Sequence, residues 1–341
     1  MPKKNYEYYN CEHILTVKDI NGLLPRIIIC CSLRGGGKTT DWQRKLLKRF
    51  LTHGEQTLFL FRTVKEYKHY DATFGNVVAK YFPDVKIESR KGDSWNELWI
   101  GNKCFAFVGT IKNSKDIKTL SNVFNNVRYI FFDEFLAHKG KYLADEVDDI
   151  MSIYSSVARG WDNPDRFVQL IMCGNIETLI NPYFERFGLA SRIQNDTKVI
   201  RGDGFVFEMF DSETIRQSHA QNSAYRALGG TYNNVVLGTY MSSDCFIGKP
   251  ENNDYREYFF TLRYRGKEYG VKRYRNFYYV DDKPDQSCKR KVAASREDMT
   301  PEYLTNGFGF EYQLCKKQFD AGLFRFKNFE CKDAFFRFLS I

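Results

Sequence analysis

The chain has 341 residues, too many for one ordinary hydrophobic core, so its length predicts two domains. No apolar run approaches the roughly 18 residues of a membrane helix, and the N-terminal residues MPKKNYEYYN lack the apolar stretch of a secretory signal, so we expect neither a membrane protein nor a secreted one. The net charge of +9 is compatible with a polyanionic partner, and the nine scattered cysteines, without a CxxC pair, are expected to be reduced thiols and not zinc ligands.

The first predicted strand leads into a glycine-rich loop. Residues 26–31 form an apolar run, residues 32–37 read SLRGGG, and the helical pattern of residues 41–52 follows a Lys-Thr-Thr sequence. Glycines let successive backbone N–H groups turn inward around a polyanion, and the start of a helix adds partial positive charge. Strand, glycine turn, Lys-Thr and helix are the layout of a phosphate-binding loop. We therefore expect ATP to be bound by Ser32, Leu33, Arg34, Gly35, Gly36, Gly37, Lys38, Thr39 and Thr40.

Individual residues of this loop have distinct expected roles. Lys38 would reach the β and γ phosphates, and the Thr39 hydroxyl would ligate Mg²⁺. Ser32 occupies the position where the pattern usually opens with glycine. Arg34 is a candidate catalytic arginine that would act within its own subunit, on the nucleotide or on Glu134. An ordinary strand–turn–helix is the alternative interpretation of the loop.

A hairpin and a second motif strand come next. Residues 57–61 predict another strand, and residues 96–109 predict a hairpin at the sheet edge that turns at Gly101-Asn102. The run VRYIFF, residues 127–132, predicts a buried parallel strand that ends at Asp133 and Glu134. Because ligand groups lie at the carboxyl ends of such strands, we expect Asp133 to hold the Mg²⁺ hydration shell and Glu134 to activate the attacking water. A solvated turn is the alternative.

Two more polar residues follow predicted elements. The helical pattern of residues 144–156 is followed by Arg159, a candidate for the arginine that a ring ATPase offers to the γ-phosphate of a neighbouring subunit; a surface arginine is the alternative. Residues 167–173 predict a strand that ends in Gly174-Asn175. In P-loop ATPases with a strand inserted between the two motif strands, a polar residue at this tip contacts the γ-phosphate and the water, which makes Asn175 a candidate catalytic residue. The start of a turn is the alternative.

The alternation of strands and helices predicts an α/β fold. Residues 1–205 are expected to form a P-loop ATPase domain with a mostly parallel sheet. The polar segment 206–236 predicts a helical linker that opens with a capping signal at Ser212 and closes at Gly229-Gly230. Residues 237–341 predict a small α+β domain of short strands, with helical patterns at residues 301–322 and 328–339.

The predicted C-terminal domain contains a basic and aromatic segment. Residues 255–296 hold twelve basic and five acidic residues, interleaved with Tyr and Phe. Such alternation suits a sheet face that contacts the phosphates of a nucleic acid, although a solvated antiparallel sheet gives the same pattern. The candidate nucleic-acid-binding residues of this segment are Arg263, Arg265, Lys272, Arg273 and Arg275.

The chain resembles the genome-packaging ATPases of φ29-type tailed phages, which are relatives of the large terminase subunits. The resemblance covers most of the chain, is strongest over the first 190 residues or so and is weak from about 190 to 290. An opening serine also suits terminase-like phosphate loops. The matching pieces are SLRGGGKT, HGEQTLFLFR, YIFFDEF, VAR at 157–159, GNIETLINPYF at 174–184 and the closing GLFRFKNFECKDAFFRFL.

The resemblance implies an ATP-driven motor of the ASCE type that moves double-stranded DNA into a preformed prohead. The expected assembly is a homopentameric ring docked on the portal vertex, in which Arg159 acts in trans. Such a protein would work in the host cytoplasm, attach transiently to the prohead and be absent from the mature virion. Its C-terminal domain would be a vestigial RNase H-like nuclease that binds nucleic acid, including a structural packaging RNA in some members.

Alternative functions are also compatible with the sequence. One is a terminase with an active nuclease, in which Asp281 after the strand-like YYV would ligate a metal. Another is a different P-loop translocase or helicase. In a packaging motor, lysines before the Asp133 strand would grip DNA phosphates in the pore without reading sequence, although such a run is also typical of a solvated face. These lysines are Lys112, Lys115 and Lys118.

Overall fold

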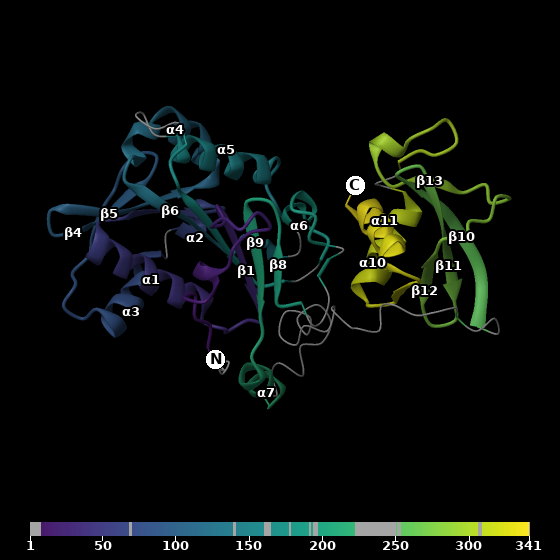
Figure 1. The fold of residues 1–341 in the computed structure, drawn as a ribbon, viewed down its shortest axis with the longest axis horizontal. Helices are drawn as coiled ribbons and strands as arrows, with labels where there is room; N and C mark the ends of the chain where they lie inside the picture. The colour runs from purple at the N-terminus through teal and green to yellow at the C-terminus, as the bar shows by residue number, and fades with distance from the viewer. Residues whose placement is uncertain are drawn as a thin grey trace. The chain divides into compact units, whose positions relative to one another are not determined.

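A computed structural model describes residues 8–67, 70–138, 141–159, 165–176, 179–190, 192–193, 197–221, 250, 254–305 and 309–340. These residues form two compact units (Figure 1). The N-terminal unit comprises the described parts of Met1–Ile176 and Lys198–Ser223, and the C-terminal unit comprises those of Glu177–Thr197 and Ala224–Ile341. Within the described residues, no helix is both long and apolar enough to cross a lipid bilayer.

In the described part of the N-terminal unit, a nine-stranded sheet has the order β3-β4-β5-β2-β6-β7-β1-β9-β8. The central run from β5 to β9 is parallel, and β3, β4 and β8 add antiparallel pairs at the two edges. The mixed α/β fold with a parallel sheet therefore agrees with the prediction. The strands are β1 (Ile27–Ser32), β2 (Gln56–Phe61), β3 (Glu88–Arg90), β4 (Asn96–Ile100), β5 (Lys103–Thr110), β6 (Val127–Asp133), β7 (Gln169–Gly174), β8 (Val199–Arg201) and β9 (Phe205–Phe210).

Helices cover both faces of this sheet (Figure 1). Helices α1 and α3 lie on one face, and α4 and α5 lie on the other. Trp42 and Leu46 of α1 pack in one core with sheet residues such as Ile28 and Phe59, because apolar residues recur on one side of the helix. The helical elements are η1 (Ile14–Thr16), α1 (Lys38–His53), α2 (Val64–Tyr67), α3 (Tyr70–Tyr81), η2 (Ile111–Asn113), α4 (Ser114–Thr119), η3 (Ser121–Phe124), α5 (Glu146–Ala158) and α7 (Glu213–Gln221), where η marks a short 3-10 helix.

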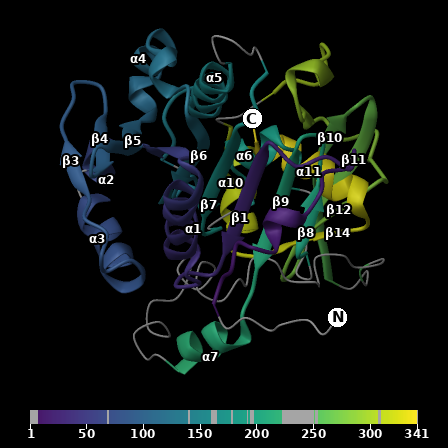
Figure 2. The same cartoon turned by 60° about the vertical axis from the view of Figure 1, so that its left-hand side comes forward.

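Strand β7 lies between β6 and β1, and the three strands are parallel (Figure 2). Cys31 of β1 stands opposite Gly174 of β7, and Asp133 of β6 stands opposite Cys173. The three strands therefore end at the same edge of the sheet, and the residues that follow them become neighbours. This is the inserted-strand arrangement on which the expected role of Asn175 depended.

In the described part of the C-terminal unit, a five-stranded sheet has the order β13-β10-β11-β12-β14. Strands β10, β11 and β12 form an antiparallel meander, while β13 pairs with β10 and β14 with β12 in parallel. Helix α11 packs on the sheet through Phe335, whose ring centre lies 4.2 Å from that of Phe324. The elements are α6 (Pro182–Arg186), β10 (Tyr255–Tyr264), β11 (Lys267–Tyr274), β12 (Tyr278–Asp281), β13 (Lys291–Ala293), η8 (Arg296–Asp298), α10 (Phe310–Asp320), β14 (Phe324–Phe326) and α11 (Phe329–Leu339).

Several elements differ from those predicted. Residues 206–210, assigned to the linker, belong to β9, which pairs with β1 so that Phe207 lies opposite Ile29. Residues 213–221 of the predicted linker are helical in α7, and residues 222–236 lie outside the described part of the chain. The helical pattern expected from residue 301 is too long: α10 begins only at Phe310, because Thr300 and Tyr303 exchange backbone hydrogen bonds in a turn. Strands β3, β8 and β14 are short and carry too little periodicity to be read from sequence.

Replacing Gly174 by alanine should destabilise the N-terminal unit. A Cβ at this position would lie 2.9 Å from Phe135 Cε1 and 3.1 Å from Leu136 Cγ, and both side chains are buried. Overpacking of this kind costs about 1–3 kcal/mol in the free energy of unfolding, which urea denaturation measures. Gly75→Ala in α3 is the matched control, because no atom lies within 4 Å of its added Cβ. Equal losses in the two variants would contradict the packing described for Gly174.

Candidate active site

The loop after β1 folds around the start of α1. Gly35 and Gly37 have φ angles of 80° and 85°, in the left-handed region that favours glycine. Gly37 is the N-cap of α1, so the Lys-Thr-Thr sequence begins the helix. The loop therefore has the strand, turn and helix geometry predicted from its sequence. Of the other predicted loop residues, Leu33 and Gly36 are buried, whereas Arg34 and Thr40 are exposed.

Lys38 lies packed against the loop and not in solvent. Its ammonium group donates a hydrogen bond to Ser32 Oγ at 2.5 Å, and only 6% of the residue is exposed. Ser32 Oγ in turn donates to the Leu33 carbonyl at 2.6 Å. A Cβ on Gly36 would lie 2.8 Å from Ser32 Oγ, so the serine side chain fits at this position only because residue 36 is a glycine. The serine that departs from the usual loop pattern therefore positions the lysine.

Asp133 and Thr39 meet at the carboxyl edge of the sheet. Thr39 Oγ1 donates a hydrogen bond to Asp133 Oδ1 at 3.0 Å. Burial raises the pKa of the Asp133 carboxyl to about 6, so a bound cation would stabilise the ionised form that burial disfavours. Hydroxyl and carboxylate oxygens are ligands that Mg²⁺ prefers. The two residues predicted to hold Mg²⁺ thus lie together, and their chemistry fits the ion.

Glu134 and Asn175 follow neighbouring strand ends. Glu134 is exposed and has a φ of 52°, an uncommon backbone conformation for a residue other than glycine. Asn175 Nδ2 donates to the Ser32 carbonyl at 2.8 Å and so joins the tip of β7 to the phosphate loop. The carboxylate expected to activate water and the amide expected to contact the γ-phosphate therefore share one edge with the loop.

Arg62 and Glu146 form a buried ion pair at this edge. Arg62 Nε donates to Glu146 Oε2 at 2.9 Å and Arg62 Nη2 to Oε1 at 3.0 Å, and the two residues are 7% and 2% exposed. The same guanidinium donates to the carbonyls of Glu134 at 3.1 Å and Phe135 at 2.7 Å. Sequence reasoning assigned no role to this pair; its only signal was an arginine closing the apolar run of residues 57–61. The pair fixes the main chain that carries Glu134.

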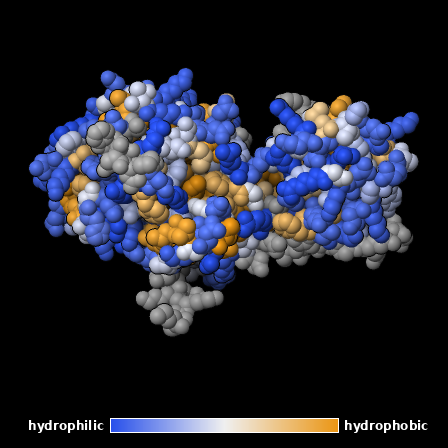
Figure 3. Space-filling model, turned by 45° about the horizontal axis from the view of Figure 1, so that its top comes forward, coloured by the Kyte–Doolittle hydropathy of each residue, from blue (hydrophilic) through white to orange (hydrophobic). Residues whose placement is uncertain are grey.

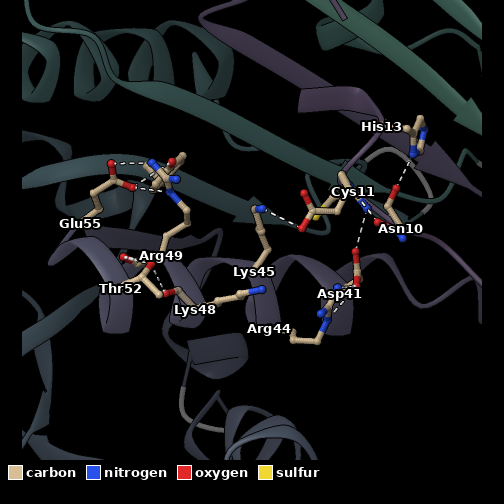
Figure 4. Close-up of polar contacts among 12 residues, drawn as sticks. Asn10, Cys11, His13, Asp41, Arg44, Lys45, Lys48, Arg49, Thr52 and Glu55 are labelled. Carbon is tan, nitrogen blue, oxygen red and sulfur yellow. Dashed lines mark hydrogen bonds and ion pairs between the residues drawn. The ribbon is translucent and has the colours of Figure 1, made fainter. Parts of the chain in front are cut away.

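The segment before β1 supports the phosphate loop. The Tyr9 backbone N–H donates to the Gly36 carbonyl at 2.9 Å, and its hydroxyl donates to Glu208 Oε2 at 2.9 Å. The Cys11 N–H donates to Asp41 Oδ2 at 2.7 Å in the first turn of α1 (Figure 4). This segment therefore connects the loop, the helix that follows it and strand β9.

The two candidate arginines lie in different places. Arg34 belongs to the loop and shares its edge with Glu134. Arg159 follows α5 directly and is exposed, and the Arg166 N–H donates to the carbonyl of Ala158 at 3.0 Å. Arg166 precedes the amino end of β7, so Arg159 lies near that end, whereas the phosphate loop lies at the carboxyl end. The six residues of β7 rise about 3.3 Å each, which separates Arg159 from the loop by roughly 20 Å. Arg159 is therefore outside the site of its own chain.

The predicted DNA-gripping lysines surround the start of α4. Lys112 and Lys115 are exposed, and Lys118 is half-buried. They follow β5, which is parallel to β2 and ends at the same edge as the phosphate loop. Elsewhere, the face of the molecule shown in Figure 3 is largely hydrophilic, with smaller hydrophobic patches.

The predicted nucleic-acid-binding residues of the C-terminal unit are partly engaged within the unit. Lys272 pairs with Asp281 at 2.5 Å, and Arg273 pairs with Glu257 at 3.3 Å. The remaining three are Arg263, which lies over the Tyr303 ring, and the exposed Arg265 and Arg275. Among the described residues, no group of three or more His, Cys, Asp or Glu side chains is arranged to hold a metal ion.

The fold and its loop place the protein among mixed α/β proteins like the phage packaging ATPases. The N-terminal domain of the DNA packaging ATPase from bacteriophage phi29 is 26% identical, with a TM-score of 0.50, and the match covers 60% of this chain and 97% of that one. The viral genome packaging motor assembly of phi29 gives a TM-score of 0.57 at 22% identity over 95% and 96% of the two chains, which shows a shared fold.

The sequence identifies the family. The profile of the Podovirus DNA encapsidation protein (Gp16) family matches residues 3–340, and the chain belongs to this family. The DNA packaging protein of Bacillus phage B103 is 27% identical over 307 residues, which cover 86% of this chain and 90% of that protein. The DNA packaging protein of Bacillus phage phi29 is 26% identical over 303 residues, which cover 86% and 87%.

Replacing Arg62 by alanine should strongly destabilise the protein. The change leaves Glu146 buried without its guanidinium partner, a loss of about 3–5 kcal/mol in the free energy of unfolding. Arg49→Ala is the matched control: Arg49 also binds a carboxylate with two nitrogens, that of Glu55, but both side chains are partly exposed (Figure 4). The control should cost about 1 kcal/mol or less. Urea denaturation measures the free energy of unfolding of both variants. An Arg62→Ala protein as stable as the control would contradict a stabilising role for the buried Arg62–Glu146 pair.

Proposed function

We propose that this protein is an ATP-driven motor that moves double-stranded viral DNA into a preformed prohead. The observation that carries the proposal is the convergence of the phosphate loop, Asp133, Glu134 and Asn175 on one sheet edge in a member of the DNA encapsidation family. Its relatives are DNA packaging proteins of Bacillus phages, which supports the same activity.

Each site residue has a chemical role in this proposal. Lys38 and the loop N–H groups bind the β and γ phosphates, while Thr39 and Asp133 hold Mg²⁺. The cation, when bound, offsets negative charge on the phosphate oxygens. The Glu134 carboxylate takes the proton of the attacking water, and Arg34 stabilises the anionic phosphates from within the subunit. Asn175 contacts the γ-phosphate and links it to β7.

Hydrolysis takes place at subunit interfaces of a ring. Arg159 lies roughly 20 Å from the loop of its own chain by the rise of β7, which supports a role in the site of a neighbour. The ring is expected to be a homopentamer docked on the portal vertex of the prohead. The protein would act in the host cytoplasm, attach to the prohead transiently and be absent from the mature virion.

DNA is held through its phosphates and not through its bases. Exposed Lys112 and Lys115 are placed to contact the backbone, which needs no sequence recognition. The C-terminal unit is proposed to be a vestigial RNase H-like domain that binds nucleic acid, including a structural RNA. The ion pair between Lys272 and Asp281 supports a binding role over cleavage, because a lysine already neutralises the carboxylate considered as a metal ligand.

The decisive experiment for this function combines ATPase and DNA-packaging assays with purified proheads. Packaging that requires ATP, proheads and this protein would support the motor. DNA-stimulated turnover without any dependence on proheads would favour a different translocase or helicase. Metal-dependent cleavage of plasmid DNA, lost in Asp281→Asn, would favour a terminase with an active nuclease.

Replacing Glu134 by glutamine should stop ATP turnover but leave ATP binding intact. Glutamine is nearly isosteric with glutamate but cannot accept the proton of water, so kcat should fall by about 100-fold or more. Fluorescent nucleotide titration should give a Kd within about twofold of that of the wild type, since Lys38 and the loop N–H groups provide the phosphate binding. Lys38→Ala is the control that should lose binding. Full turnover by the Glu134→Gln protein would remove this residue from the mechanism.

Arg159→Ala should abolish turnover in assembled rings and leave nucleotide binding near normal. Because the arginine acts on the neighbouring subunit, mixing Arg159→Ala chains with Glu134→Gln chains should restore part of the activity. In such mixed rings, some interfaces combine an intact Glu134 from one chain with an intact Arg159 from the other. A steady-state ATPase assay of the mixture measures the recovery. Normal turnover of the Arg159→Ala ring, or no recovery on mixing, would argue against the trans assignment.

A further inference from the structure

Helix α5 contacts both the Glu134 edge and the basic start of α4. Its first turn contains both Glu146, which binds Arg62, and Asp149, three residues farther along. Asp149 Oδ1 accepts a hydrogen bond from Ser114 Oγ at 3.0 Å. Ser114 is the first residue of α4, and α4 and α5 lie on the same face of the sheet (Figure 1). A side-chain hydrogen bond thus joins the two helices near their first residues.

Ser114 stands between the lysines proposed to contact DNA. Lys112 and Lys115 are exposed, whereas Ser114 is only 5% exposed. The segment therefore offers ammonium groups to solvent and anchors itself inward through a hydroxyl. A phosphate that draws Lys112 and Lys115 toward it also pulls on Ser114, because the residues are adjacent in one short helical segment.

The contacts continue from Asp149 to the catalytic carboxylate. Asp149 and Glu146 lie in the same first turn of a rigid helix, so they move together. Glu146 holds Arg62 through two hydrogen bonds, and Arg62 donates to the Glu134 carbonyl at 3.1 Å. The Glu134 main chain adopts a left-handed conformation that its surroundings must enforce. A shift of α5 therefore alters the group that fixes Glu134.

A second anchor of α4 leads elsewhere. Asp116 of α4, two residues after Ser114, accepts a hydrogen bond from Ser94 Oγ at its Oδ2 atom, at 2.8 Å. Ser94 belongs to the loop before β4 and not to α5. The two bonds are alike in chemistry and in the helix they hold, but only the Ser114 bond reaches α5.

We propose that the hydrogen bond between Ser114 and Asp149 couples DNA contact at Lys112 and Lys115 to the placement of Glu134. Ser114 and Asp149 are then positioning residues for the DNA-stimulated part of ATP hydrolysis. The inference rests on the proposed function, since it assumes that the chain hydrolyses ATP and contacts DNA. Loss of one such hydrogen bond should lower the ratio of DNA-stimulated to basal turnover about fivefold.

The test measures ATP turnover of the full chain on purified proheads, with and without linear double-stranded DNA. Ser114→Ala and Asp149→Ala should each reduce the stimulation ratio, and their combination should reduce it no further, because both remove the same bond. Ser114→Thr keeps a hydroxyl and should restore the ratio. Ser94→Ala is the matched control and should keep the wild-type ratio. A variant with both Lys112→Ala and Lys115→Ala gives the ratio expected when the DNA contact itself is lost.

The outcomes distinguish a failure of this coupling from a failure of the proposed motor function. A wild-type protein whose turnover does not respond to DNA overturns the motor proposal together with the coupling. A responsive wild type with an unchanged ratio in Ser114→Ala overturns the coupling alone. An equal loss in Ser94→Ala also overturns it, because the effect would then reflect the general anchoring of α4. Thermal denaturation of each variant shows whether a lost ratio accompanies a loss of folded protein.

Discussion

The buried ion pair between Arg62 and Glu146 is the interaction on which the rest of the active site depends. Burying two charges is favourable only when nearly all their hydrogen bonds are made. Here both Glu146 oxygens accept from Arg62, one of them also accepts from the Leu143 N–H, and the guanidinium donates to two further carbonyls. Such a network has one favourable geometry. It therefore holds the chain after β6 in the conformation that presents Glu134, which regular strand geometry would not provide.

The strand order determines which residues this fixed point can meet. With β7 between β6 and β1, the tips of three parallel strands present Glu134, Asn175 and the phosphate loop side by side. Asn175 is tied to the Ser32 carbonyl, and Gly174 leaves room for Phe135 to fold back over β7. The Phe135 N–H donates to the Cys173 carbonyl at 3.1 Å, which closes the turn. The site is thus built on the ends of rigid strands, a better support for exact placement than free loops.

The sequence was sufficient for the parts of the site that are local in the chain. The glycine turn before Lys38 and the apolar run ending at Asp133 are contiguous signals, and both have the predicted geometry. The pairing of Arg62 with Glu146 was not predictable, because it joins residues 84 positions apart and neither charge is unusual in sequence. The same holds for β9, whose apolar run gives no sign of which strand it pairs with. Nonlocal pairing is decided by packing, which local propensity does not contain.

Helix α5 gives the proposed ring a mechanical consequence. Its 13 residues span about 20 Å, with Glu146 at one end and Arg159 just beyond the other. The first end is fixed to the chain's own Glu134 through Arg62, and the second end lies far from its own phosphate loop. If Arg159 completes a neighbouring site, one rigid helix connects the hydrolysis sites of two subunits. If one end of α5 moves, the other end moves with it, because shortening the helix would break its backbone hydrogen bonds. Hydrolysis in such a ring should be ordered between neighbours and not independent.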